Sequence, residues 1–283
     1  MDKEKLIKCA FFVLGMVSVI AVGFIVFYIF SAGVPGIMKV GFSNFIFGKV
    51  WASTAQNPKF GILPLILSSL WGTFGALLIG VPVGIMCAVY IAQIAPPKLC
   101  AIFEETVNLI AGIPSVVFGL VGMMLLVPSV AKFFNLADGA SLFCAILVLT
   151  LMILPSVIKV SVASIRSVPA EYEEASLALG ATKIETIFKV ILPAAKSGIA
   201  SSVVLGSGRA IGEAMAVMMV SGNVANMPQI FGSVRFLTTG VASEMSYAGG
   251  MQREVLFSIA LVLFVFIMLI NTVLNLCFKG KTK

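Results

Sequence analysis

Residues 169–193, PAEYEEASLALGATKIETIFKVILP, form a charged segment between two long apolar runs and decide the fold. Pro169 can open a helix, and acidic residues follow in the first turns, where the helix dipole favours negative charge. Gly180 closes that helix, and Thr182 with Glu185 has the spacing of a capping box that starts a second one. The proline that ends the stretch is expected to stop this second helix. The pattern therefore predicts two short helices hinged at Gly180.

Apolar residues alternate with charge along this segment. They are Ala175, Leu177, Leu179, Ile184, Ile187 and Phe188. One interpretation is an amphipathic element that lies on a membrane surface, which requires only an apolar face and basic residues. The other is a docking surface that lays a helix into a groove of a second protein. Periodicity alone leaves both open.

The flanking runs show that the chain is an integral membrane protein. Of 283 residues 60% are hydrophobic and 11% are charged, whereas a soluble domain carries about 25% charged residues. A spanning helix needs about 20 apolar residues. We predict an all-α fold of six transmembrane helices in one domain, 1–283, with approximate spans at 9–30, 66–92, 107–130, 139–158, 198–222 and 255–278 and a loop at 159–197.

The formal charge of +7 follows the positive-inside rule. With six spans and an inside N-terminus, 12 of the 19 Lys and Arg residues fall on the cytoplasmic side, and Arg209 falls within a span. The six on the outer side are Lys39, Lys49, Lys59, Lys132, Arg235 and Arg253. We therefore expect both termini in the cytoplasm and no nucleic-acid partner.

Several chemistries are excluded by composition. The chain has no histidine and five scattered cysteines, so it offers no His-based catalytic triad and no evident metal site. A G-x-x-x-x-G-K-[ST] phosphate loop does not occur in the sequence, so the chain does not hydrolyse ATP by that route. We therefore expect that the chain is not an enzyme and has no cofactor of its own.

Arg209 and Glu213 interrupt the predicted fifth span. Being four residues apart, they are expected to share one helix face. Each charge near mid-membrane costs about 2.5–3.5 kcal/mol, so ionisable residues there usually mark a pathway. The guanidinium of Arg209 offers a planar fork of donors suited to an oxyanion. Glu213 is then expected to orient Arg209; alternatively, the two charges only neutralise each other and fix helix packing.

The charged segment resembles the EAA loop of ABC-importer permeases. The matching positions are Glu174, Ala175, Ser176, Gly180, Val190, Leu192 and Pro193, with mild departures at Ser176 and Val190. The resemblance implies the type I ABC importer permease fold and a coupling helix that inserts into a separate ATPase subunit. It also implies that ATP and Mg²⁺ are bound by that partner, and it favours the docking interpretation.

Two further stretches resemble permeases of the high-affinity phosphate ABC importer, the Pst system. They are residues 208–217, GRAIGEAMAV, and residues 111–120, AGIPSVVFGL, and the run 215–223 is similar to the PstC type. The resemblance implies a bacterial or archaeal cytoplasmic membrane protein that forms half of a phosphate pathway. The implied partners are a PstA-like permease, two PstB-like ATPase subunits and an external PstS-like phosphate-binding protein. Ser115, in the second stretch, is a candidate to line the pathway with Arg209 and Glu213.

Two alternatives stay open. The first is an ABC importer for another oxyanion, such as phosphonate, sulfate or molybdate, because a guanidinium fork suits all of them. The second is an ATP-independent channel or secondary carrier that uses the charged pair as a gate. Secondary carriers commonly show inverted repeats, and the sequence shows no such symmetry.

Overall fold

The computed structural model describes residues 3–279 and is helical apart from one short strand pair. β1 (Trp51–Ala52) pairs antiparallel with β2 (Lys59–Phe60), with Trp51 opposite Phe60. The helices are α1 (Lys3–Val40), α2 (Phe42–Phe47), α3 (Leu63–Val89), α4 (Pro97–Gly112), α5 (Ser115–Val121), α6 (Val127–Phe133), α7 (Leu142–Arg166), α8 (Ala170–Ala178), α9 (Lys183–Thr186), α10 (Leu192–Ala194), α11 (Lys196–Gly212), α12 (Met215–Val220), α13 (Leu237–Glu244) and α14 (Gly250–Lys279). π-helical turns η1 (Tyr90–Ile94), η2 (Gly122–Leu126) and η3 (Ile187–Ile191) join neighbouring helices. The predicted all-α fold is confirmed.

Five of the described helical segments are long and apolar enough to span a membrane. They are Ile7–Val40, Leu63–Ile94, Ser115–Phe133, Leu142–Arg166 and Gly250–Leu274. A sixth span exists only if Lys183–Ala194 and Lys196–Gly212, which meet at 69°, are taken as one bent span. The predicted number of six spans is therefore reached only if this bent pair is counted as one span.

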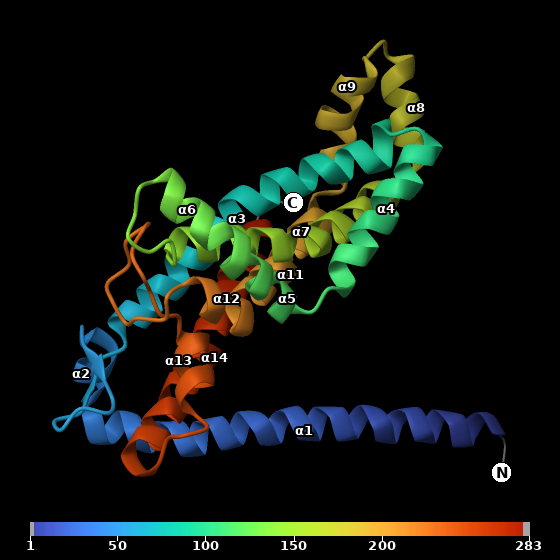
Figure 1. Cartoon of the computed structure of the whole chain (residues 1–283). Helices are drawn as coiled ribbons and strands as arrows, with labels where there is room; N and C mark the ends of the chain where they lie inside the picture. The colour runs from blue at the N-terminus through green and yellow to red at the C-terminus, as the bar shows by residue number, and fades with distance from the viewer. Residues whose placement is uncertain (1–2, 280–283) are drawn as a thin grey trace.

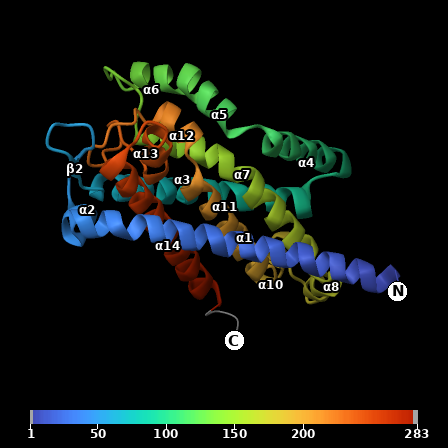
Figure 2. The same cartoon turned by 90° about the horizontal axis from the view of Figure 1, so that it is seen from below.

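The centre of the bundle is built from α3, α7 and α11 (Figure 1). Glycines on α3 allow α7 to approach closely: a Cβ at Gly80 would lie 2.7 Å from Ile153, and one at Gly84 would lie 2.7 Å from Val157. Small residues at such contacts are the usual means by which membrane helices pack, because lipid provides no hydrophobic driving force. In Figure 2, α4, α5 and α6 follow one another along one edge of this bundle.

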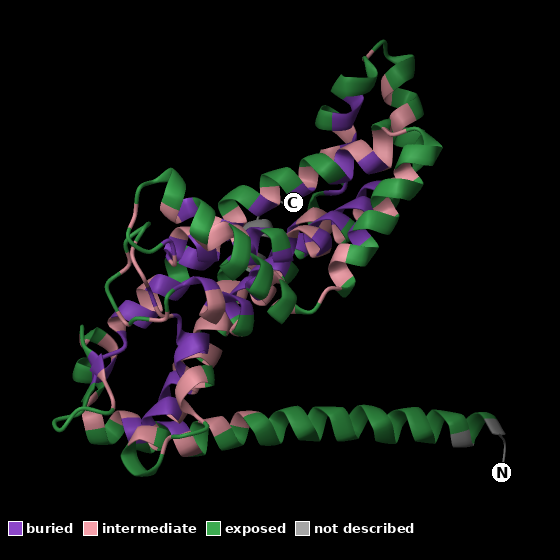
Figure 3. Cartoon of the chain, in the orientation of Figure 1, coloured by how far each residue is buried: buried purple, intermediate pink, exposed green. Residues whose placement is uncertain are grey.

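α1 contacts the rest of the chain mainly through its C-terminal half. Gly33 and Gly36 lie against α14, and Tyr28 makes an edge-to-face ring contact with Phe257. Residues 7–25, which precede this contact, are exposed along the helix, as Figure 3 shows. α1 continues to Val40, ten residues beyond the predicted end of the first span at residue 30.

The predicted third span, 107–130, is not one helix. α4 ends at Gly112, Ile113 and Pro114 are extended, and a new helical segment begins at Ser115 and reaches Phe133. Proline disfavours helical backbone in the residue before it, which explains the extended conformation of Ile113. The span therefore begins about two turns later than predicted.

The predicted fifth span, 198–222, is also interrupted. α11 ends at Gly212, Glu213 is extended with φ −73° and ψ 126°, and α12 starts at Met215. The carboxylate of Glu213 accepts a hydrogen bond from the Ala216 N–H at 2.9 Å. A carboxylate that caps the next helix competes with continuation of the first one, which explains the break.

α7 is longer than the predicted span 139–158, because it continues helically to Arg166. Lys159 and Arg166 therefore lie on a helix, and the loop assigned to 159–197 begins only after Arg166. Arg166, in the last turn of α7, lies where the negative end of the helix dipole favours a cation.

Candidate functional site

Arg209 lies in the last turn of α11 and reaches across to α7. Its Nη1 donates a hydrogen bond to Ser156 Oγ at 3.3 Å, and the residue is partly exposed. An arginine side chain carries five N–H donors in a planar fork. One donor is directed to Ser156, so most of the fork is available to an anion.

Glu213 does not neutralise Arg209. Among the described residues the structure contains no ion pair between them, and the expectation that the two side chains share one helix face is wrong. Glu213 lies beyond the end of α11, where its carboxylate caps α12 and its backbone carbonyl accepts a hydrogen bond from Thr238 Oγ1 at 2.8 Å. A spacing of four residues predicts a shared face only in an unbroken helix, and α11 ends at Gly212.

Ser115 lies beside the second helix break. It is the first residue of α5, is partly exposed, and makes no hydrogen bond through its hydroxyl within the described part of the chain. α5 packs on α12 through Gly119, where a Cβ would lie 2.8 Å from the Cα of Ala216. Ser115 lies one turn before this contact at the start of α5. Glu213 lies one turn before it on the other segment, just ahead of α12. The two helix breaks therefore lie at the same end of the packed pair.

The two short helices predicted around Gly180 are present. α8 ends before Gly180, which has φ +87°, and the capping box of Thr182 with Glu185 starts α9. The hydroxyls of Ser176 and Thr186 lie 2.8 Å apart and connect the two helices. Figure 1 shows α8 and α9 projecting beyond one end of the bundle.

The projecting loop joins the bundle through buried apolar residues, among them Ile187 and Ile191, and exposes apolar side chains at its tip. Leu179, next to the hinge, is 90% exposed, and Ile184 is 57% exposed. Glu174 and Ala175 are exposed, whereas Ser176 and Leu192 are partly buried. Pro193 lies at the end of the helical segment Lys183–Ala194, which stops one residue later, and the 69° bend follows at Ala195. The predicted helix end is therefore correct to within one residue, because proline lacks the N–H that continues a helix.

Comparison with known proteins assigns the chain to a family. Residues 80–279 match the family described as binding-protein-dependent transport system inner membrane component. The chain belongs to this family. A probable ABC transporter permease of Bacillus subtilis, YqgH, is 40% identical over 78% of this chain and 74% of its own length. The phosphate transport system permease protein PstC 2 of Mycobacterium tuberculosis is 31% identical over 98% of this chain and 92% of its own.

Solved structures support the permease fold. A bacterial ABC transporter that imports the acidic polysaccharide alginate has a TM-score of 0.67 at 17% identity and covers 99% of both chains. The inward-facing MetNI methionine ABC transporter has a TM-score of 0.58 at 20% identity and covers 79% of this chain and 95% of that one. The permease therefore has the type I ABC importer fold, as the resemblance of residues 174–193 to the EAA loop implied.

Two features of the permease were missed from sequence. Ser156, the partner of Arg209, is a single serine in an apolar run, and only the fold places it beside α11. Arg235, counted as an outer-loop charge, forms a largely buried ion pair with Glu244. Glu244 also accepts hydrogen bonds from Trp51, Ser53 and Gln252. No spacing rule connects these positions.

Proposed function

We propose that this permease is a transmembrane subunit of an ATP-driven importer of inorganic phosphate and forms half of its translocation pathway. The observation that carries the proposal is the availability of Arg209: its guanidinium lies at the end of α11, hydrogen-bonded to Ser156 and not paired with Glu213. A guanidinium fork binds tetrahedral oxyanions through paired charge-assisted hydrogen bonds. The similarity to PstC permeases of three species, at 30–33% identity, supports phosphate as the substrate.

Phosphate is delivered on the outer side by a separate binding protein, passes Arg209 and leaves on the inner side. Ser115, at the helix break beside α12, contributes a hydroxyl to the same path. Glu213 keeps the end of α11 free by capping α12, so that Arg209 is presented without a counter-charge in its own helix.

The energy comes from two ATPase subunits of the PstB type, which bind ATP and Mg²⁺ themselves. They dock on α8 and α9, where Glu174, Ala175, Ser176, Gly180, Leu192 and Pro193 form the loop and Leu179 its exposed apolar tip. A docked partner shifts the helices only if it binds the outward-open and inward-open states with different affinities. A PstA-like permease completes the pathway, and the chain itself needs no cofactor.

The proposed orientation has both termini in the cytoplasm of a bacterial or archaeal cell and α8–α9 on the same side. This follows from the excess of Lys and Arg in the segments that six spans place inside. It also places β1, β2 and α13 outside, within reach of the binding protein.

The test is uptake of radiolabelled phosphate at low concentration in a strain without this gene, complemented with the gene, in the presence of competing oxyanions. Uptake that returns on complementation and is inhibited by arsenate, but not by sulfate or phosphonate, supports the proposal. Phosphate uptake that never depends on the gene contradicts it, and inhibition by sulfate or phosphonate assigns the permease to another oxyanion.

A further inference from the structure

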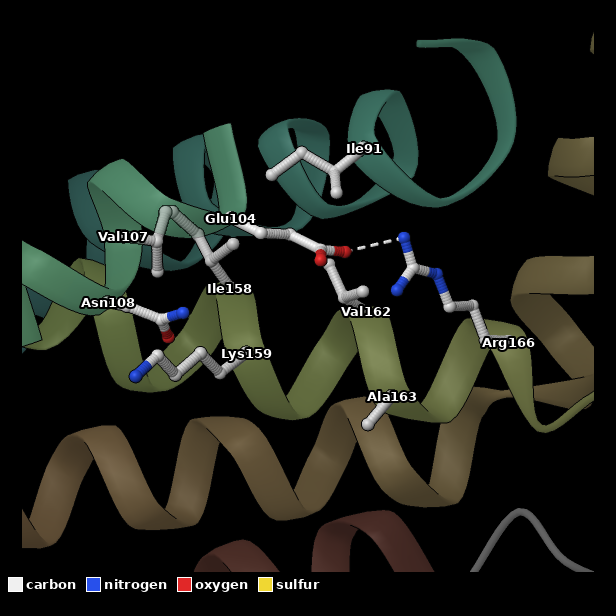
Figure 4. A pocket seen from close by; sticks show the side chains of 9 residues that line it. All are labelled: Ile91, Glu104, Val107, Asn108, Ile158, Lys159, Val162, Ala163 and Arg166. Carbon is white, nitrogen blue, oxygen red and sulfur yellow. Dashed lines mark ion pairs between the residues drawn. The ribbon is translucent and has the colours of Figure 1, made fainter. Parts of the chain in front are cut away.

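A polar pocket lies between α4 and α7, separate from Arg209. Its volume is about 230 Å³, and Glu104, Asn108, Lys159 and Arg166 supply its polar groups. Figure 4 shows these side chains lying between the two helices, with Ile91, Val107, Ile158, Val162 and Ala163 around them. The pocket thus combines apolar walls with a few convergent polar groups, as small-ligand sites do.

The charges in this pocket are not balanced. Arg166 Nη2 pairs with Glu104 Oε1 at 2.6 Å and also contacts Cys100 Sγ at 3.1 Å. Lys159 has no ion pair or hydrogen bond to any residue that the structure describes. The pair of Arg166 with Glu104 is neutral overall, so the ammonium of Lys159 leaves the pocket with one uncompensated positive charge.

Lys159 is also aligned with the proposed pathway. Ser156, Lys159, Ala163 and Arg166 are spaced by three, four and three residues along α7, which places them on one helix face. Lys159 is therefore one turn, a rise of about 4.5 Å, from the serine that holds Arg209. It lies on the side of Ser156 that leads toward the α8–α9 loop.

We propose that Lys159 and Asn108 form a second site for a phosphate group, on the cytoplasmic side of Arg209. This inference rests on the proposed function, since phosphate that leaves Arg209 moves along this face of α7. An ammonium is a compact point charge without the fork of a guanidinium. Lys159 therefore attracts a phosphate group without fixing its orientation in the way that the fork of Arg209 does. Such binding suits a site from which phosphate must be released.

A phosphate group reaches this pocket from one of two sources. It is the transported ion, or it is the headgroup of an anionic lipid in the cytoplasmic leaflet, which attracts basic residues near the membrane surface. Both are recognised by the same ammonium and amide donors, so the lipid composition of the test membrane distinguishes them.

The experiment uses the complete transporter in proteoliposomes and measures initial rates of radiolabelled phosphate import against external phosphate concentration. The variants are Lys159→Gln, Lys159→Arg and Asn108→Ala, and Lys98→Gln is the control, because Lys98 is an exposed lysine at the start of α4. Each is tested in pure phosphatidylcholine and in a mixture with phosphatidylglycerol. Co-purification with the ATPase checks that every variant is folded and assembled.

Lys159→Gln is expected to lower the maximal rate about tenfold, the usual effect of losing one charge-assisted hydrogen bond. KM should not change, since external phosphate is captured upstream, and Lys159→Arg should keep most of the rate. A loss in both membranes identifies the transported ion, and a loss only with phosphatidylglycerol identifies a lipid headgroup.

An assembled Lys159→Gln transporter with the wild-type rate in both membranes overturns the second site and leaves the proposed function standing. Equal losses in Lys98→Gln and Lys159→Gln also overturn it, because the effect would then be one of surface charge. A wild-type transporter that imports no phosphate refutes the proposed function, and the second site falls with it.

Discussion

Arg209 is available to an anion because Glu213 leaves the helix. In an unbroken helix the two side chains would be neighbours and would pair. In the structure the carboxylate of Glu213 instead accepts the Ala216 N–H, and the guanidinium turns to Ser156. Because α11 ends before Glu213, the carboxylate of Glu213 caps α12 and the guanidinium of Arg209 is left to bind an anion.

The capping role of Glu213 has a measurable consequence for stability. Glu213→Ala should lower the free energy of unfolding by about 1 kcal/mol, because helix caps contribute about that amount. Glu213→Gln should lose less, since its amide oxygen still accepts a hydrogen bond. Thermal unfolding of the purified permease measures both variants. Equal losses for Ala and Gln would contradict the cap and would indicate that the charge matters instead.

The Glu244 network should make the permease sensitive to acid. Burial opposes the ionisation of Glu244, but hydrogen bonds from Trp51, Ser53 and Gln252 and the charge of Arg235 outweigh it and hold its pKa below the ordinary value of a glutamate. A lowered pKa stabilises the fold fully above the ordinary value and loses that contribution as pH falls through the folded one. The melting temperature should therefore fall as pH drops below about 4.3, and less so in Glu244→Gln.

The fluorescence of Trp51 reports on the same network, because its indole Nε1–H donates a hydrogen bond to Glu244. The chain has two tryptophans, so Trp71→Phe leaves Trp51 as the only one. Its fluorescence should change over the acid range in which the melting temperature falls. An unchanged Trp51 signal across that range would locate the acid sensitivity elsewhere.

At the scale of elements, local rules predicted the docking helices and failed at the helix breaks. The capping box at Thr182 and the glycine at 180 depend only on neighbours in sequence, and both are confirmed. The breaks at Ile113–Pro114 and Glu213–Ala214 fall inside apolar runs, where hydropathy carries no information on where a helix ends. Pro114 was a usable signal, whereas the break at Glu213 depends on a hydrogen bond that only the folded chain shows.

The hinge between α8 and α9 depends on backbone conformation rather than on space. A Cβ at Gly180 would contact no atom within 4 Å, but the residue has φ +87°. Gly180→Ala should cost about 1–2 kcal/mol locally and weaken attachment of the ATPase. Gly180→Asn should be milder, because asparagine adopts this conformation more readily. Co-purification of the ATPase compares the two, and identical retention with Ala and with wild type would contradict the role of the hinge.

The exposed tip of this element makes a separate prediction. Leu179→Asp replaces a 90% exposed apolar side chain with a charge, so the folding of the permease should not change. Its ATPase should detach or lose coupling, because an apolar anchor in a groove carries much of a docking energy. Ile230→Asp, a change at another exposed apolar residue that also lies outside the membrane spans, is the comparison for effects unrelated to docking. Full ATPase binding by Leu179→Asp would place the docking surface elsewhere on the loop.

At the scale of the whole molecule, composition was enough to predict a helical membrane protein but not its packing. The contact of α3 with α7 depends on Gly80 and Gly84 meeting Ile153 and Val157, which are far apart in sequence. The same fold brings Ser156 to Arg209 and Lys159 to the α4 pocket. The candidate site was therefore predicted as a set of residue types, whereas its pairings required the three-dimensional arrangement.

The measurement that tests this account most directly is phosphate uptake by Arg209→Gln and Arg209→Lys in cells that lack the wild-type gene, with ATPase co-purification on the same membranes. The account predicts that Gln abolishes uptake, that Lys restores only a small part of it because the fork is lost, and that both variants retain the ATPase. Normal uptake by Arg209→Gln with the ATPase bound would contradict the claim that Arg209 contacts the transported anion.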